Sequence, residues 1–402
     1  MLREYEAKSG KKALNLSLGN PDSIPPLEVL KLQAEYALKP DFELHTYAED
    51  NNLNQFCEGM VERFTQVKYR DFAHLKAVPI PGIKTATALL PLACGLHSKE
   101  RSSFNVVTHM PAYDVMGTWS TSYLGGKRIV WPLLPEEGMR MGFQGLLGAL
   151  KQAGVSRPDL IFVIRPGNPA SQGASAGEWK PLIQFCIENK VRLVNDGAYT
   201  TLAPKGSHVP LIEVAKDYPK LEWLELFSVS KSFSDPGARL GVAVGSQEFI
   251  EDFILIKGNT ESGPVPSVMA AYGELFKNEK LCTGLLADLL ALYQSRLNYL
   301  IPTLQKAGFI QASESAAGLF TLWRTPDVAY GLEVSKEAER RGLTHAECFN
   351  QMVIERAGIV GVHFPGPYIR YAVCTDVLSP DFQTNFELSL AAIEPKYFPK
   401  TS

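Results

Sequence analysis

The sequence predicts an α/β protein whose central sheet is mostly parallel. Apolar, strand-like runs alternate with helix-like segments through the middle of the chain, which is the pattern that crossover helices between parallel strands produce. The run Leu160–Ile164 is apolar throughout, as expected of a strand that is buried on both faces. A chain of 402 residues is also long enough for two or three domains.

The composition is that of an ordinary globular protein, with 45% hydrophobic and 21% charged residues. A net charge of −3 gives no sign of a nucleic-acid-binding surface. No window approaches the roughly eighteen consecutive apolar residues of a membrane span, and Met1–Lys8 has no apolar signal core. The six cysteines are scattered, and the seven histidines lack zinc spacing. The sequence therefore predicts a cytoplasmic protein with reduced thiols and no metal site.

The elements are predicted from periodicity and from turn residues. Residues 1–30 are expected to form an arm, in which Leu14–Leu18 alternates like a strand and ends in a turn. The expected helices are Leu27–Leu38, Glu58–Phe64, Glu178–Asn189 and Leu281–Gln305. The expected strands are Asn105–Thr108, Leu160–Ile164, Val191–Asn195, Trp223–Val229, Leu240–Gly245 and Gly318–Trp323. The helix from Leu281 is expected to join a large domain to a small C-terminal one.

Several of these elements end at side chains that could serve a site. Gly82 precedes an expected helix start at Ile83 and Lys84, where free backbone N–H groups favour an anion. Tyr113 follows the strand that begins at Asn105. By itself, a glycine before a helix indicates only a tight turn.

The two strands in the middle of the chain lead into polar turns. Asn168 follows the strand that ends at Ile164, and Asp196 follows the strand that ends at Asn195. Tyr199 lies three residues beyond Asp196. Taken singly, an Asn-Pro dipeptide is a turn signal, and an aspartate after a strand is usually a cap.

Lys231 lies between two strand-like runs and is surrounded by small hydroxyl residues. Ser228, Ser230 and Ser232 supply hydroxyl groups, and Arg239 supplies a fork that suits a phosphate. Such a lysine can attack carbonyl groups once its pKa is lowered. Lysines in serine-rich loops are common, so the segment gains weight only from its companions elsewhere in the chain.

The Ser-x-Ser-Lys segment, with an arginine eight residues after the lysine, resembles the lysine motif of the class I/II aminotransferases. These are pyridoxal phosphate enzymes of fold type I. Further segments similar to that family appear in the family's order between about residues 14 and 375, among them those around Gly19, Tyr47 and Arg370. Two departures are Ile83, where serine is usual, and Asn52, where glycine is usual.

The resemblance implies a three-layer αβα large domain with a mostly parallel sheet, plus a smaller α/β domain. On this basis we expect an N-terminal arm and part of the small domain at 1–30, the large cofactor-binding domain at 31–285, and the small C-terminal domain at 286–402. It also implies a homodimer in which Tyr47 reaches the cofactor phosphate of the neighbouring subunit.

The resemblance further implies the roles of the site residues. Lys231 would be the catalytic residue and hold pyridoxal 5'-phosphate as a Schiff base. The other cofactor-binding residues would be Gly82, Ile83, Lys84, Tyr113, Asn168, Asp196, Tyr199, Ser228, Ser230, Arg239 and Tyr47. Gly19, Asn168 and Arg370 would bind substrate, Arg370 through the α-carboxylate. Arg165 is the next candidate for that carboxylate.

The implied activity is transfer of an amino group between an amino acid and a 2-oxo acid by a ping-pong mechanism, as part of amino-acid biosynthesis. The Pro-Gly-Asn-Pro-Ala turn and the Ser-Asp-Pro-Gly-Ala-Arg run are somewhat similar to bacterial diaminopimelate-pathway and valine–pyruvate aminotransferases. Three alternatives stay open: a carbon–sulfur lyase of the same fold, a non-catalytic relative that binds the cofactor, and an interaction protein that has lost it.

Overall fold

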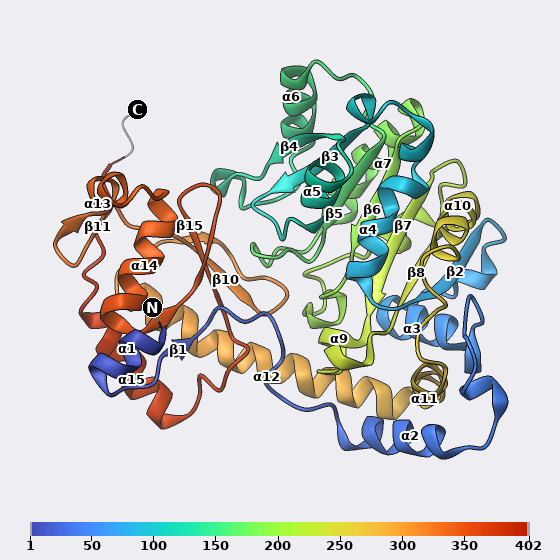
Figure 1. The fold of residues 1–402 in the computed structure, drawn as a ribbon, viewed down its shortest axis with the longest axis horizontal. Coiled ribbons are helices and arrows are strands. Elements are labelled where there is room, and N and C mark those ends of the chain that lie inside the picture. The colour runs from blue at the N-terminus through green and yellow to red at the C-terminus, as the bar shows by residue number, and fades with distance from the viewer. Residues whose placement is uncertain (1, 400–402) are drawn as a thin grey trace.

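A seven-stranded sheet forms the centre of the larger of two bodies in the computed structural model, which describes residues 2–399 (Figure 1). In spatial order its strands are β2 (Leu75–Ile80), β8 (Gly241–Ser246), β7 (Trp223–Ser228), β6 (Arg192–Asp196), β5 (Leu160–Ile164), β3 (Asn105–Met110) and β4 (Lys127–Pro132). Only β8 runs antiparallel to its neighbours; the other pairs in this sheet are parallel. The mostly parallel sheet is therefore confirmed.

Helices cover both faces of this sheet (Figure 1). They are α2 (Leu27–Leu38), α3 (Phe56–Thr65), α4 (Ile83–Ala93), α5 (Val115–Thr118), α6 (Phe143–Ala153), α7 (Ala176–Asn189), α8 (Leu211–Ala215), α9 (Val229–Ser232), α10 (Gln247–Lys257) and α11 (Pro266–Lys277). Strand β5 shows how the layers form, because its successive side chains point to opposite faces. Phe162 packs in a core with residues of α4 and α10, whereas Ile161 and Val163 pack in another with residues of α3, α6 and α7. The predicted three-layer α/β arrangement is confirmed.

The second body is built around a four-stranded antiparallel sheet, in the order β14-β15-β10-β9. Its elements are β9 (Gln311–Ser313), β10 (Phe320–Arg324), β11 (Val328–Ala329), β12 (Leu332–Glu333), α13 (Val334–Arg341), α14 (His345–Ala357), β13 (Ile359–Val360), β14 (Val362–Phe364), β15 (Tyr368–Ala372) and α15 (Pro380–Ala391). The long helix α12 (Glu279–Lys306) runs between the two bodies (Figure 1). Its Cys282 packs in the core of the first body, and its Leu297 and Leu304 pack in the core of the second.

The N-terminal segment belongs to the second body before it crosses to the first. It forms α1 (Leu2–Ser9) and then β1 (Leu14–Asn15), which pairs in parallel with β13. Farther along the arm, α2 packs against α11. Both chain ends therefore contribute to the second body. The division into 1–30, 31–285 and 286–402 stays a prediction, since α12 is continuous across the last of these boundaries.

The element around Lys231 differs from the expectation. The predicted strand ends at Ser228 because the Ser228 hydroxyl accepts a hydrogen bond from the backbone N–H of Ser230 at 3.1 Å. Such a cap favours a helix start, and Lys231 accordingly lies in the short helix α9. Among residues 2–399, no helix is both long and apolar enough to cross a membrane.

Candidate active site

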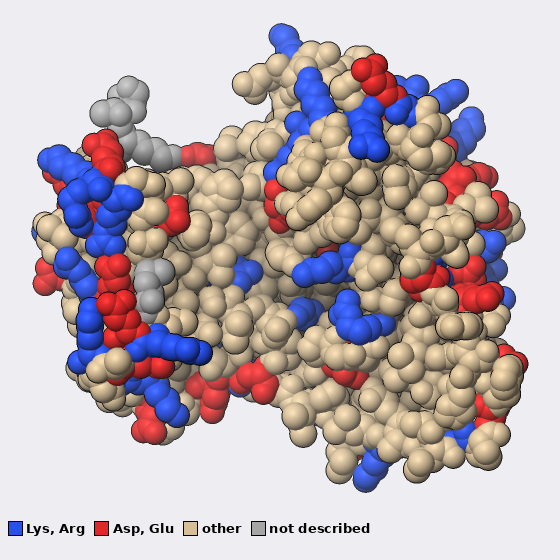
Figure 2. Space-filling view, viewed as in Figure 1, with Lys and Arg blue, Asp and Glu red and all other residues tan. Residues whose placement is uncertain are grey.

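A cavity of about 530 Å³ opens at the edge of the sheet where β5, β6 and β7 end. Figure 2 shows a hollow near the middle of this face, with Lys and Arg side chains around it. The residues that line the cavity are Gly19, Asn20, Ile83, Lys84, Thr87, Tyr113, Val115, Phe162, Ile164, Asn168, Asp196, Ala198, Tyr199, Ser228, Ser230, Lys231, Pro236, Arg239 and Arg370. The carboxyl ends of parallel strands are the usual place for a binding site in such sheets.

The fold explains why residues far apart in sequence meet here. Asp196 is the last residue of β6, and Ser228 is the last residue of β7. Helix α4 begins shortly after β2, which runs in the same direction as β7. The second body contributes Arg370, from β15, to the same cavity.

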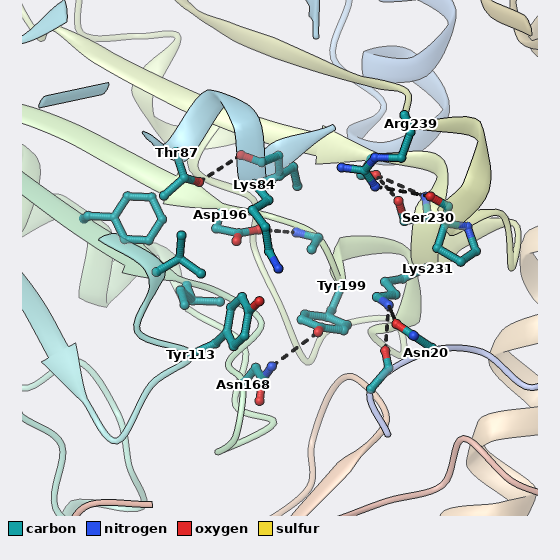
Figure 3. Close-up of a pocket in the computed structure, with 18 of the residues that line it drawn as sticks. Asn20, Lys84, Thr87, Tyr113, Asn168, Asp196, Tyr199, Ser230, Lys231 and Arg239 are labelled. Carbon is teal, nitrogen blue, oxygen red and sulfur yellow. Dashed lines mark hydrogen bonds between the residues drawn. The ribbon is translucent and has the colours of Figure 1, made fainter. Parts of the chain in front are cut away.

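The Lys231 side chain points at the N-terminal arm (Figure 3). Its Nζ donates hydrogen bonds to the carbonyl oxygen of Gly19 at 2.6 Å and to Oδ1 of Asn20 at 3.3 Å. Burial lowers the pKa of Lys231, and the nearby cations of Arg370 and Arg239 lower it further. A lysine with a lowered pKa holds its proton less tightly, as a nucleophilic amine requires.

Asp196 is a carboxylate without a cationic partner. Its Oδ1 accepts a hydrogen bond from the backbone N–H of Ala198 at 3.0 Å, and no ion pair among residues 2–399 includes it within 4.0 Å. Burial raises the pKa of Asp196 to about 6, against an ordinary value of 3.8. A buried carboxylate that faces a cavity without a counter-ion suits a ligand that brings its own cation.

Asp196→Asn should stabilise the ligand-free protein in a pH-dependent way. Because the folded-state pKa lies above the ordinary value, the wild-type protein loses stability as pH rises from about 4 to about 6. Asparagine removes that loss, so the gain should be near zero below pH 4 and reach about 3 kcal/mol above pH 6. Thermal unfolding of both proteins across this range measures it, and a difference independent of pH would contradict the prediction.

Arg370 is a buried cation of the cavity. Its Nη1 donates to Oδ1 of Asn168 at 2.8 Å, and its Nη2 donates to the carbonyl oxygen of Ser17 at 2.5 Å. The guanidinium carbon lies 4.4 Å from the centre of the Phe320 ring, and its Nε is buried without a hydrogen-bond partner. The Asn168 amide donates weakly to the Tyr199 hydroxyl at 3.5 Å (Figure 3). Each terminal nitrogen of this clamped guanidinium carries a second N–H, so Arg370 can receive a carboxylate.

The opposite end of the cavity offers hydroxyl groups and a helix start. The Ser228 hydroxyl donates to the Ser230 hydroxyl at 2.8 Å, and Arg239 lies beside them with weak bonds to backbone carbonyls. Gly82 has φ +87°, and a Cβ there would lie 2.5 Å from Nη2 of Arg239. Only glycine therefore lets Arg239 approach the N-terminus of α4. Ile83 lines the cavity without a hydroxyl group, while backbone N–H groups at this end favour an anion.

Of the three tyrosines predicted to serve the site, two line the cavity and one lies on the surface. Tyr113 lines the cavity, its backbone N–H donates to the Asn168 carbonyl oxygen at 2.9 Å, and its ring centre lies 5.6 Å from the Lys84 ammonium. Tyr199 also lines the cavity, and burial raises the pKa of its hydroxyl well above the ordinary value. Tyr47 does not line it; 73% of its side chain is exposed on the surface.

Ser232 and Arg165, which the sequence also suggested, lie outside the cavity, and Gly82 does not line it either. Ser232 is buried and bonded to the Thr201 hydroxyl at 2.8 Å, because the α9 turn directs it away from the cavity. Arg165 is fully buried, and its guanidinium donates to the carbonyl oxygens of Met139 and Gln172. Those bonds hold it beneath the turn that carries Asn168, so the expectation that it is the next candidate for a substrate carboxylate is wrong for this arrangement.

The hydrogen bonds that the N-terminal arm makes to the site were not predicted from the sequence. Asn20 accepts a hydrogen bond from Lys231, and the Ser17 carbonyl oxygen accepts one from Arg370. Asp22 fixes this segment through a bidentate ion pair with buried Arg296 on α12. The Asn-Pro-Asp run after Gly19 was the available signal, but a turn sequence does not reveal which distant side chain its carbonyl groups meet.

The groups that line the cavity together determine which kind of ligand it can bind. It combines a lysine amine, a buried carboxylate without a partner, an arginine beside a helix start where an anion can bind, and a second arginine with N–H groups left to donate. Such a cavity can hold an anionic, carbonyl-bearing ligand at one end and a carboxylate at the other.

Comparison with known proteins agrees with this chemistry. The LL-diaminopimelate aminotransferase of Methanocaldococcus jannaschii is 26% identical over 367 residues, which cover 90% of this chain and 80% of that protein. The LL-diaminopimelate aminotransferase of Syntrophobacter fumaroxidans is 27% identical over 385 residues, with 93% and 89% covered.

Solved structures support the fold. Substrate-bound BacF from Bacillus subtilis has a TM-score of 0.79 at 16% identity and covers 99% of this chain and 95% of its own. The aspartate aminotransferase of Thermus thermophilus with maleate has a TM-score of 0.75 at 20% identity, with 97% and 95% covered. Residues 11–386 match the family described as aminotransferase class I and II. The chain belongs to this family and is an aminotransferase.

Proposed function

We propose that this aminotransferase binds pyridoxal 5'-phosphate in the cavity and moves an amino group between an amino acid and a 2-oxo acid. When bound, the cofactor supplies a carbonyl carbon for an amine and a ring that withdraws electrons from the substrate α-carbon. The proposal rests on one observation: Lys231, Asp196 and Arg370 line the same cavity. These are the groups that the cofactor and an amino-acid carboxylate need.

The residues at the helix-start end would hold the cofactor phosphate. Arg239 supplies a cation, Ser228 and Ser230 supply hydroxyl groups, and the start of α4 supplies backbone N–H groups from Ile83 and Lys84. Gly82 permits the close approach of Arg239 that brings these donors together. Loss of the family's serine at position 83 removes one hydroxyl donor while leaving the backbone donor in place.

The remaining residues would orient the ring and the substrate. Asp196 would keep the ring nitrogen protonated, and Tyr113 would stack on the ring. Asn168 and Tyr199 would bind its phenolic oxygen. Arg370 would hold the substrate α-carboxylate beside Gly19, and Lys231 would carry the α-proton as general base and then acid.

The named relatives point to the substrate. Both relatives described above are LL-diaminopimelate aminotransferases, and we propose that this chain uses an amino acid of this kind in amino-acid biosynthesis, in the cytoplasm. A carbon–sulfur lyase is not favoured, because the relatives given above are aminotransferases.

A panel of amino donors tests this proposal. The holoenzyme is mixed with LL-diaminopimelate, aspartate or alanine without an oxo acid, and oxo-acid release is measured. Release limited to one equivalent per site, and made catalytic by 2-oxoglutarate, is expected of a ping-pong aminotransferase. Continuous production of pyruvate and ammonia from a cysteine conjugate would instead identify a lyase.

We further propose a homodimer in which Tyr47 reaches the cofactor phosphate of the partner subunit. Six large apolar side chains are exposed within a short stretch of the N-terminal region: Leu18, Ile24, Leu27, Leu38, Phe42 and Tyr47. Such a concentration of exposed apolar groups favours a protein interface, and a second copy of the chain would cover it.

Asp196→Ala should lower kcat by at least about a hundredfold, which is roughly 2.7 kcal/mol of barrier. Without the carboxylate, the ring nitrogen would lose its proton and the ring would withdraw electrons less strongly. Cofactor affinity should fall much less, because the phosphate donors remain. Steady-state kinetics at saturating cofactor measure the effect, and an unchanged kcat would reduce Asp196 to a strand-end cap.

A further inference from the structure

We infer that Lys257 is a positioning residue whose buried ammonium fixes the Tyr47 loop (residues 45–52) in the conformation that the partner subunit's phosphate site requires. The inference rests on the proposed function, specifically on the proposed contact between Tyr47 and the partner. Lys257 does not line the cavity, and nothing in the proposed chemistry uses it.

The Lys257 ammonium is enclosed by oxygen atoms. Only 1% of the residue is exposed, at the C-terminal end of α10. Its Nζ donates to the carbonyl oxygen of Glu49 at 2.9 Å and to Oδ1 of Asp50 at 2.8 Å, and lies 3.0 Å from Oε1 of Glu261. Two of these oxygens accept hydrogen bonds from the ammonium and belong to the Tyr47 loop, whereas the Glu261 carboxylate contributes an ion pair without a hydrogen bond.

The backbone of this loop is held at further points. The N–H of Glu49 donates to the Ser262 carbonyl oxygen at 2.7 Å. Gly263 has φ +91°, and a Cβ there would lie 2.5 Å from the Glu49 carbonyl oxygen. Glu49 itself has φ +50°, an uncommon conformation for a residue other than glycine, which needs support from its surroundings.

The loop places the exposed Tyr47 ring between two buried side chains. Leu44 is 6% exposed and Ala48 is 2% exposed, whereas Tyr47 between them is 73% exposed. Tyr47 therefore projects from a segment whose neighbours are fixed inside the protein. A ring that packs within its own chain would not need this arrangement.

The buried Lys257 ammonium is better suited to positioning the loop than to stabilising the fold. Burying an ammonium costs desolvation energy, and a buried ion pair often adds no more stability than well-packed apolar groups. What the ammonium adds is direction, because it bonds to specific oxygens of Glu49 and Asp50. A Tyr47 loop that is ordered before assembly lowers the entropy cost of reaching the partner's phosphate.

The test compares cofactor loss from four holoenzymes: wild type, Tyr47→Phe, Lys257→Met, and the double variant. Each is diluted into buffer with an excess of a trap for free pyridoxal phosphate, and the rate of loss is followed by absorbance. Lys277→Met is the matched control, because Lys277 is an exposed lysine paired with Glu274 on α11. Asp50→Ala removes the loop's side-chain contact and serves if Lys257→Met fails to fold.

Tyr47→Phe and Lys257→Met should each speed cofactor loss about tenfold, the effect of one lost hydrogen bond to a charged group. The double variant should lose cofactor no faster than Tyr47→Phe, since two residues that act through one contact are not additive. Lys277→Met should match wild type, and Asp50→Ala should follow Lys257→Met.

These variants test two claims separately: the positioning role of Lys257, and the proposed contact between Tyr47 and the partner subunit. If Tyr47→Phe retains cofactor like wild type, the proposed inter-subunit contact is wrong, and the inference fails with it. If Tyr47→Phe loses cofactor faster but Lys257→Met matches wild type, or if the two effects multiply in the double variant, the inference alone is overturned.

Discussion

Lys231→Ala should abolish amino transfer and remove the visible absorbance of the lysine-bound cofactor, while the fold persists. The Lys231 amine is the proposed nucleophile and proton carrier, so its loss removes two functions at once. We expect a fall in kcat of at least about a thousandfold. Its hydrogen bonds run to Gly19 and Asn20 of the arm, so circular dichroism and the melting temperature should change little.

A second lysine of the cavity provides the control. Lys84 also lines it and stands near the Tyr113 ring, but its side chain is exposed. Lys84→Ala should keep the absorbance band, because only its backbone is proposed to bind cofactor. Near wild-type turnover in Lys231→Ala would overturn the proposed function.

Arg370→Ala should lower kcat/KM for every amino acid and 2-oxo acid, because all of these substrates share the α-carboxylate. Two charge-assisted hydrogen bonds would be lost, each worth about 1.5–3 kcal/mol, so the fall should be about 10²- to 10⁴-fold. Arg370→Lys should recover only part of it, since an ammonium restores charge but not the planar fork. Steady-state kinetics with several substrates measure the effect.

The absorbance of the resting enzyme distinguishes substrate binding from cofactor binding. Arg370→Ala should leave it unchanged, whereas Arg239→Ala should weaken retention of the cofactor, because Arg239 lies at the phosphate end. Normal kcat/KM with lost cofactor in Arg370→Ala would place Arg370 outside the substrate site. Arg165 could not then replace it, because its guanidinium is enclosed beneath the turn.

The sheet and much of the cavity were predictable because strand ends carry strong local signals. Leu160–Ile164 is apolar without interruption, and its bounds agree with the structure. Parallel strands place their carboxyl ends at one edge, which is why Asn168, Asp196 and the serines around Lys231 lie together, as the family resemblance implied. Gly82 was readable as a helix start, but its contact with Arg239 depends on two loops about 157 positions apart in the sequence (Gly82 and Arg239).

The other features of the site depend on contacts that leave no local pattern in the sequence. Ser232 alternates with Ser228 and Ser230 in sequence, yet a single helical turn directs it into the interior toward Thr201. Backbone carbonyl groups carry no residue identity, so the bonds of Lys231 to Gly19 and of Arg370 to Ser17 could not be predicted. The buried ammonium of Lys257 belongs to the same class, because surface and buried lysines look alike in a sequence.

The pairing of β1 with β13 has a consequence for how the protein is made. The partners of β1 and Leu16 are the backbone groups of Gly358, Val360 and Ala372, far downstream in the sequence. Domains begin to fold on the ribosome as the chain emerges, but β1 must wait unpaired until these strands have been synthesised. The arm therefore meets Arg370 only after residues 358–372 have been translated. An mRNA that stops before codon 358 would yield a chain whose large sheet has all its strands but whose β1 has no strand to pair with.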